Sequence, residues 1–271
     1  MLDFFMMHLK YYNIYIYIYM KIVNLIYFKD KSVNGNFGDE LSKFITIQLI
    51  NKEKYKLVFN QKNKLLNLVC IGSYIHRAKN NSYIFGSGVR TPNKNGHKYN
   101  NLKICSVRGP LSRKFLINTK KIDVPEIYGD PALLLPKFYK PDIIDKLKDI
   151  IGIVPHKSNY NKYLNNIDTT KFYLINPTDK WQNVINYICS CKCILSSSLH
   201  GLICSDAYNK PNLWLDGFKL AEGDFKFKDY FASQKRDYIK INKLSEYKNE
   251  LLYIGGNNID LNRLFKSFPF L

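Results

Sequence analysis

The stretch CILSSSLHGLICSDAYNKP, residues 193–211, has the pattern of a strand that stops at a run of serines and turns into a helix. After the serines, Leu199, Ile203 and Ala207 recur at helical spacing, which predicts that His200 lies in the first helical turn. A helix start leaves backbone N–H groups unpaired and carries the positive end of the helix dipole. Serine hydroxyls, free amides and an imidazole therefore meet at one point, which predicts an anion site. The alternative is a serine cap with the histidine packed under a loop.

The length and composition suit an α/β protein with an anionic partner. The chain has 271 residues, of which 46% are hydrophobic, enough for one large or two small domains. It carries 41 Lys and Arg against 22 Asp and Glu, a net charge of +19, and only six of the cations are arginines. Because lysine, asparagine, isoleucine and tyrosine all abound, part of this charge reflects an AT-rich coding sequence. The rest favours a membrane surface, a phosphorylated substrate or nucleic acid.

Residues 1–19 are expected to be an N-terminal extension, with the native start at Met20. They end in alternating tyrosine and isoleucine, which a TA repeat in DNA would encode. Polar residues interrupt this segment before it reaches the length of a membrane span, and it lacks the small-residue cleavage site of a signal peptide. The six cysteines show no disulfide framework, which favours a reducing, cytoplasmic compartment. Cysteines 189, 191 and 193 lack the two-residue gap of zinc sites, so no metal is expected.

Short apolar runs alternate with helical patterns in two series. The first begins with a strand at 21–28 and a helix at 39–50 capped by Asp39, and it ends with a helix opened by Gly109 and Pro110. The second runs from a strand at 150–154 to a strand at 213–215 and contains the stretch quoted above. Strands that alternate with helices predict parallel sheets.

We therefore expect two Rossmann-like domains that face a cleft. The expected limits are 20–140 and 141–242, with a C-terminal tail at 243–271 that packs back on the first domain. A helix is expected near 244–252, and residues 217–271 show no chemical motif. No G-x-G-x-x-G fingerprint follows a strand, which argues against a dinucleotide cofactor.

Four loops at predicted strand ends contain more glycine, polar and charged residues than a purely structural loop requires. They have the sequences NFGD, GSG, VRGPLS and GDPALL, and they begin at residues 36, 86, 107 and 129. In an open α/β sheet, ligands bind beyond the carboxyl ends of the strands, so these loops are expected to share one site. The candidate residues in them are Asn36, Asp39, Gly86, Ser87, Arg108 and Asp130. Taken singly, each is also explained by a turn glycine, a capping aspartate or a surface ion pair.

Eight motifs follow one another between Asn36 and Pro211: NFGDE, IGS, GSGV, VRGPLS, GDPALLLP, IVPH, SSSLHGLI and DAYNKP. Their order and spacing resemble those of the polysaccharide pyruvyl transferase family, in particular its exopolysaccharide-type branch. The resemblance implies a glycosyltransferase-B-like fold and transfer of the enolpyruvyl group of phosphoenolpyruvate to a sugar. The product would be a pyruvate ketal with release of phosphate, and the acceptor a glycan or lipid-linked saccharide. The resemblance carries contact with the donor onto His200 and Arg108, whereas Ser198 stands where many members have arginine.

The chemistry of that reaction suits these residue types. Phosphoenolpyruvate brings a carboxylate and a phosphate, which helix-start amides near Ser197, Ser198 and Gly201, the Arg108 fork and His200 can bind. Ketal formation also needs a proton for the methylene carbon and a base for the attacking hydroxyl. The candidates for proton transfer are His200, Asp39, Asp130 and His156. His156 follows the strand at 150–154 and is expected to face the cleft, with an ordinary loop histidine as the alternative.

Two other functions remain as alternatives. A glycosyltransferase that uses a nucleotide sugar would need a carboxylate for the ribose in the second half, and none is convincing after Leu195. A nucleic-acid-binding module would suit the charge, but the lysines are spread along the chain without a binding motif. We therefore expect no nucleic-acid partner, no cofactor, and a cytoplasmic enzyme with peripheral contact to an anionic membrane surface.

Overall fold

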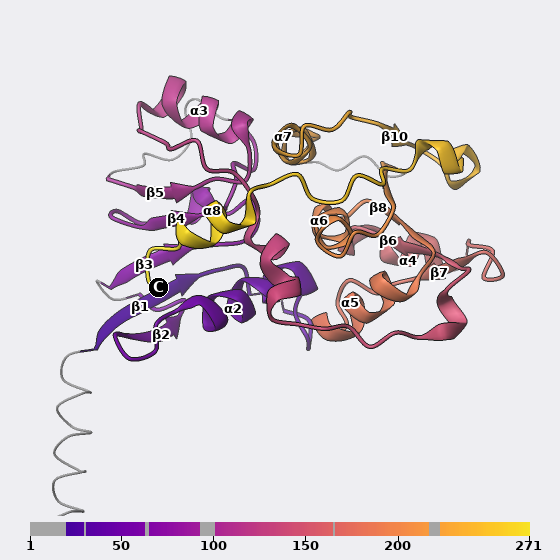
Figure 1. Cartoon of the computed structure of the whole chain (residues 1–271), viewed down its shortest axis with the longest axis horizontal. Coiled ribbons are helices and arrows are strands. Elements are labelled where there is room, and N and C mark those ends of the chain that lie inside the picture. Colours follow the sequence, from indigo (N-terminus) through magenta and orange to yellow (C-terminus); the bar gives the residue numbers. More distant parts are fainter. Residues whose placement is uncertain (1–19, 30, 63–64, 93–100, 165, 217–222) are drawn as a thin grey trace, which may run out of the picture.

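A computed structural model describes residues 20–29, 31–62, 65–92, 101–164, 166–216 and 223–271 (Figure 1). Two parallel five-stranded sheets form it, with strand orders β2-β1-β3-β4-β5 and β10-β9-β8-β6-β7. The expected α/β class with two Rossmann-like halves is confirmed. The limits near residues 140 and 242 stay predictions.

The first half contains β1 to β5. Its elements are β1 (Lys21–Ile26), α2 (Phe37–Leu49), β2 (Tyr55–Phe59), β3 (Leu66–Val69), η1 (Ile75–Arg77), β4 (Tyr83–Phe85), β5 (Lys103–Ser106), α3 (Pro110–Lys120) and η2 (Pro131–Lys137). β1 lies inside the sheet, with Val23 in register with both Leu57 and Leu66. Pro110 opens α3 as predicted, because proline at the first helical position loses no needed N–H.

The second half contains β6 to β10. Its elements are η3 (Asp145–Leu147), β6 (Ile151–Val154), η4 (Lys157–Asn159), α4 (Tyr160–Leu164), β7 (Phe172–Leu174), α5 (Trp181–Ser190), β8 (Cys193–Ser196), α6 (Leu199–Ala207), β9 (Asn212–Leu215), α7 (Phe225–Ser233), β10 (Lys240–Ile241), η5 (Leu244–Glu246), η6 (Asn249–Leu251) and α8 (Leu261–Lys266). All four residues of β8 are buried, as expected for a central strand of a parallel sheet covered on both faces. The strand ends at Ser196 and the helix begins at Leu199, so the predicted strand-to-helix turn is confirmed.

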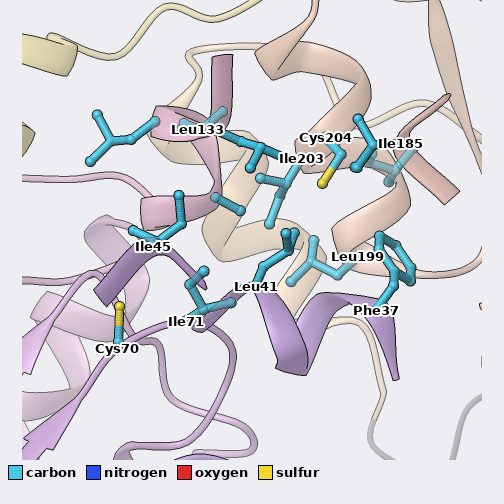
Figure 2. Packing of buried hydrophobic residues seen from close by; sticks show 14 of the residues in the cluster. Phe37, Leu41, Ile45, Cys70, Ile71, Leu133, Ile185, Leu199, Ile203 and Cys204 are labelled. Carbon is cyan, nitrogen blue, oxygen red and sulfur yellow. The ribbon is translucent and has the colours of Figure 1, made fainter. Parts of the chain in front are cut away.

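A continuous hydrophobic core joins the two halves. Leu41 and Ile45 of α2 lie near Leu199 and Ile203 of α6, with Leu133 of η2 completing the group (Figure 2). The backbone N–H of residue 37 also donates to the carbonyl oxygen of residue 177, at 3.0 Å. This packing places α2 beside α6 and ties its start to the second half.

The last residues of the chain return to the first sheet. Phe268 packs edge-on against Phe85 with ring centroids 5.1 Å apart, and Phe270 does the same against Tyr83 at 4.9 Å. Figure 1 shows α8 and the C-terminus over the first half. Contact of the tail with the first half was expected from the sequence.

Two local expectations were wrong. Asn36, not Asp39, caps α2: its side-chain oxygen accepts a hydrogen bond from the N–H of Gly38. The region 244–252 forms two short 3-10 turns instead of one helix. The region after residue 217 contains two α-helices, α7 and α8, which the sequence patterns did not predict.

No helix in the described parts of the chain is long and apolar enough to cross a bilayer.

Candidate functional site

A pocket of about 440 Å³ lies between the two halves, where loops follow the ends of β1, β3, β4, β6 and β8. Five residues proposed from the sequence line it together: Asn36, Asp39, His156, Ser198 and His200. The other residues that line it are Phe28, Gly72, Ser73, Tyr74, His76, Arg90, Lys157, Ser158, Leu199 and Lys226. The position of this pocket at the carboxyl ends of parallel strands is the usual place for a ligand in an α/β fold.

The serine run shapes the turn that presents His200. Ser196 donates from its hydroxyl to the Val154 carbonyl oxygen and accepts from the N–H of Ser198, at 3.1 Å. Ser198 is the N-cap residue of α6 but makes no side-chain cap bond. A Cβ atom on Gly201 would lie 2.2 Å from the Ser196 hydroxyl oxygen, so glycine lets α6 start this close to β8. Gly201 thus has a packing role in this turn.

The imidazole of His200 is held between the two halves. A Cβ atom on Gly38 would lie 2.0 Å from its Nδ1 atom, and the Phe37 ring stands edge-on to it at 6.4 Å. Its Nε2 atom lies 3.7 Å from Oδ2 of Asp130, too far for a hydrogen bond, and has no hydrogen-bond partner among the described residues. The side chain is 12% exposed. His200 therefore connects a buried carboxylate to the pocket.

Asp130 lies behind the pocket. It is fully buried, and its two oxygens accept hydrogen bonds from the N–H groups of Ala132 and Gly72, at 3.0 and 3.3 Å. The first bond caps η2 and the second holds the loop after β3. Asp130 therefore holds the pocket wall and lies next to the His200 imidazole without lining the pocket.

Ser87 also supports the loop after β3. Its hydroxyl donates to the Gly72 carbonyl oxygen at 2.9 Å and accepts from the N–H of Tyr74 at 3.1 Å. Gly86 beside it has a φ of +68°, and a Cβ atom there would lie 2.3 Å from Pro131. Neither residue lines the pocket: Ser87 fixes the loop that does, and Gly86 allows the close approach of Pro131.

Arg108 is fully buried beneath the same loop. Its Nε and Nη2 atoms each lie 3.0 Å from Oδ2 of Asp229, and Nη2 also donates to the Val89 carbonyl oxygen at 3.0 Å. Its Nη1 atom donates to the hydroxyl of Ser73, which lines the pocket. All three guanidinium nitrogens therefore have partners within the protein, and direct contact of Arg108 with the donor stays a prediction.

Ser197 and His156 are linked across the second half. The N–H of His156 donates to the Ser197 hydroxyl at 2.8 Å, and the His156 Nδ1 atom lies 2.8 Å from the Ser158 hydroxyl. Ser197 therefore holds the backbone that carries His156 into the pocket. This link joins the loops that follow β6 and β8.

Sequence reasoning did not select several residues of the pocket. Ser73 lies in the motif IGS, and Arg90 directly follows the motif GSGV, so both positions carry a usable signal in the sequence. Lys157 follows His156 directly. Lys226 comes from α7, where no motif marks it.

The pocket is strongly basic. Arg90, Lys157 and Lys226 line it together with three histidines, whereas Asp39 is the one carboxylate among its described lining residues. Burial raises the pKa of Tyr74, which lines the same pocket, so its hydroxyl is neutral at physiological pH. Such a site favours a multiply charged anion.

The cysteines show no sign of reactive or metal chemistry in the part of the chain that the structure describes. Burial raises the pKa of Cys189 and of Cys191 to about 12, which keeps both thiols protonated. No group of three His, Cys, Asp or Glu side chains with metal-binding spacing occurs among the described residues.

The sequence is similar to known proteins over most of its length. It is 29% identical over 253 residues to an uncharacterized protein of Acanthamoeba polyphaga mimivirus, covering 90% of this chain and 83% of that protein. Residues 8–217 match the family model described as polysaccharide pyruvyl transferase. Together with the motif loops gathered around the pocket, this match shows that the chain belongs to the polysaccharide pyruvyl transferase family.

Proposed function

We propose that the protein transfers the enolpyruvyl group of phosphoenolpyruvate to a sugar residue, forming a pyruvate ketal and releasing phosphate. The observation that carries this proposal is the basic pocket at the start of α6, lined from both halves and containing His200. Phosphoenolpyruvate brings two anionic groups on three carbons, which suits a small pocket with an excess of cations.

The reaction needs three events at the central carbon of the donor. A proton adds to the methylene carbon, two sugar hydroxyls form C–O bonds to the central carbon, and the bond from that carbon to the phosphate oxygen breaks. Phosphate leaves with the electron pair of that bond, and the two hydroxyl protons pass to a base and to the leaving phosphate. One proton donor and one base near the donor are therefore required.

We assign the proton donor to His200 and the base for the acceptor hydroxyl to Asp39. Both line the pocket, and the Asp130 carboxylate lies 3.7 Å from Nε2 of His200 on the side away from the pocket. Asn36 and His156 then face the acceptor side, while Ser198 and the amides of the first turn of α6 bind the donor. In this scheme Arg108, Ser87 and Asp130 act through the loop after β3 and are positioning residues.

The acceptor is proposed to be a glycan or lipid-linked saccharide of the exopolysaccharide type, reached at the cytoplasmic face of a membrane. The net charge of +19 supports peripheral contact with an anionic membrane surface. A second candidate function is a glycosyltransferase that uses a nucleotide sugar. The family match favours pyruvyl transfer over it.

The test is to incubate the protein with phosphoenolpyruvate and a panel of glycans. Pyruvyl transfer releases phosphate and adds the mass of pyruvic acid less one water to a glycan. Parallel reactions with nucleotide sugars serve as the comparison, and His200→Asn is the control variant. Transfer of a sugar without phosphate release from phosphoenolpyruvate would overturn the proposal in favour of the glycosyltransferase.

A further inference from the structure

Helix α7 lies between β9 and β10 of the second sheet in sequence but packs against α3 of the first half (Figure 1). Asp229, in the middle of α7, is fully buried and accepts hydrogen bonds from Arg108. It also accepts from the hydroxyl and the backbone N–H of Ser112, at 2.6 and 2.8 Å. A single carboxylate therefore fastens α7 to the start of α3.

The approach of α7 is close enough to involve its backbone. A Cβ atom on Gly109 would lie 2.0 Å from the carbonyl oxygen of Asp229, so a larger residue at 109 would force the helix away. The position of α7 is thus fixed by its side chain and by its main chain. Residues one helical turn from Asp229 are therefore held in place as well.

Lys226 lies one turn before Asp229 on the same helix and lines the pocket. Among the three lysine and arginine side chains that line it within the described residues, Arg90 and Lys157 are exposed. Lys226 is only 8% exposed. A positive charge that is largely removed from water acts on an anion more strongly than an exposed one.

Arg108 does not line the pocket, and its guanidinium nitrogens bind Asp229, the Val89 carbonyl oxygen and the Ser73 hydroxyl. The ammonium of Lys226 has three N–H donors, so it can bind an anion while it keeps a contact within the protein. Lys226 is therefore the cation of this region that is both desolvated and at the pocket surface.

We propose that Lys226 binds an anionic group of the donor and that Asp229 positions it by fastening α7 to the first half. The inference rests on the proposed function, because it takes phosphoenolpyruvate as the ligand. It adds a binding residue that lies outside the loops with recognisable motifs.

The experiment is calorimetric titration of phosphoenolpyruvate into the wild type, Lys226→Gln and Lys228→Gln. Lys228 lies on the same helix but is exposed, over the ring of Tyr238, so it is a matched control. We expect Lys226→Gln to weaken binding by about 10- to 100-fold, the effect of losing one hydrogen bond to a charged group. Lys228→Gln is expected to bind within about twofold of the wild type, since an exposed charge contributes little.

The outcomes distinguish the proposed function from the proposed role of Lys226. If the wild type does not bind phosphoenolpyruvate, the proposed function fails, and this inference fails with it. If the wild type binds and a folded Lys226→Gln binds equally well, the inference is overturned while the proposed function stands. Lys226→Met keeps the apolar stem, so it replaces Lys226→Gln if the latter melts early. A loss that appears equally in Lys228→Gln would also overturn the inference, because it would reflect only net charge.

Discussion

Replacement of Arg108 by lysine tests the network beneath the pocket. The guanidinium joins Asp229, the Val89 carbonyl oxygen and the Ser73 hydroxyl from a fully buried position. A lysine ammonium keeps the charge that compensates Asp229, but one nitrogen cannot reach all three partners from the geometry of the arginine fork. At least one buried partner is then left without its hydrogen bond.

The structure allows the size of this effect to be estimated. Loss of one or two hydrogen bonds that involve a charged group costs about 1.5–3 kcal/mol each, and a broken buried ion pair costs about 3–5 kcal/mol. Because the ion pair is kept in part, we expect Arg108→Lys to lower the free energy of unfolding by about 3 kcal/mol. For a chain of this size, that lowers the melting temperature by roughly 6–12 °C.

The assay is thermal unfolding followed by circular dichroism, with donor saturation measured on the same samples. Arg263→Lys is the control, since Arg263 is exposed on α8 and its replacement is expected to change stability by less than about 0.5 kcal/mol. Arg108→Lys is also expected to weaken donor saturation, because the loop that carries Ser73 loses support. A variant that melts like the wild type would refute the argument that this network holds the loop.

Three further predictions address the site and the second half. His200→Asn is expected to bind phosphoenolpyruvate without turnover, because an amide cannot give up a proton at neutral pH; near-normal turnover would contradict the catalytic role. Gly38→Ala is expected to lower turnover at least tenfold, since its methyl group would lie 2.0 Å from Nδ1 of His200; a fully active variant would show that the imidazole can move without loss. Burial raises the pKa of Asp206 to about 6 from 3.8, even though Arg236 opposes this rise, so the folded state binds the proton more tightly. The contribution of Asp206 to stability is therefore present below pH 4 and is lost as the pH rises through 6; urea unfolding should show this slope in the wild type and a flatter one in Asp206→Asn, and equal slopes would exclude Asp206 as its source.

Local patterns in the sequence predicted most of the fold and five of the residues that line the pocket. The strand that ends at Ser196, the helix that follows, and the proline start of α3 each depend on neighbouring residues alone. The predicted cap residue of α2 was wrong because Asn36 and Asp39 both suit a helix start, and only the backbone conformation distinguishes them. A choice between two cap candidates this close in sequence requires the backbone conformation from a structure.

The partners of Arg108 could not be predicted in the same way. Asp229 is 121 residues away along the chain, and nothing near it in the sequence marks it as a partner. The prediction that Arg108 binds the donor was based on its planar guanidinium group. It did not include the carboxylate of Asp229, which competes for that group. Lys226 was overlooked because it is one lysine among many, and only its burial distinguishes it.

The two helix starts that meet at the pocket suggest how it is divided between donor and acceptor. The first turn of α2 already contains two carboxylates, Asp39 and Glu40, which complement its positive end. The first turn of α6 contains no acidic residue, so its dipole and free amides remain for an anion from outside. The donor is therefore expected at α6 beside His200, and a neutral sugar hydroxyl at α2 beside Asp39. Because the core packing in Figure 2 holds α2 against α6, donor and acceptor would meet where the two halves are joined.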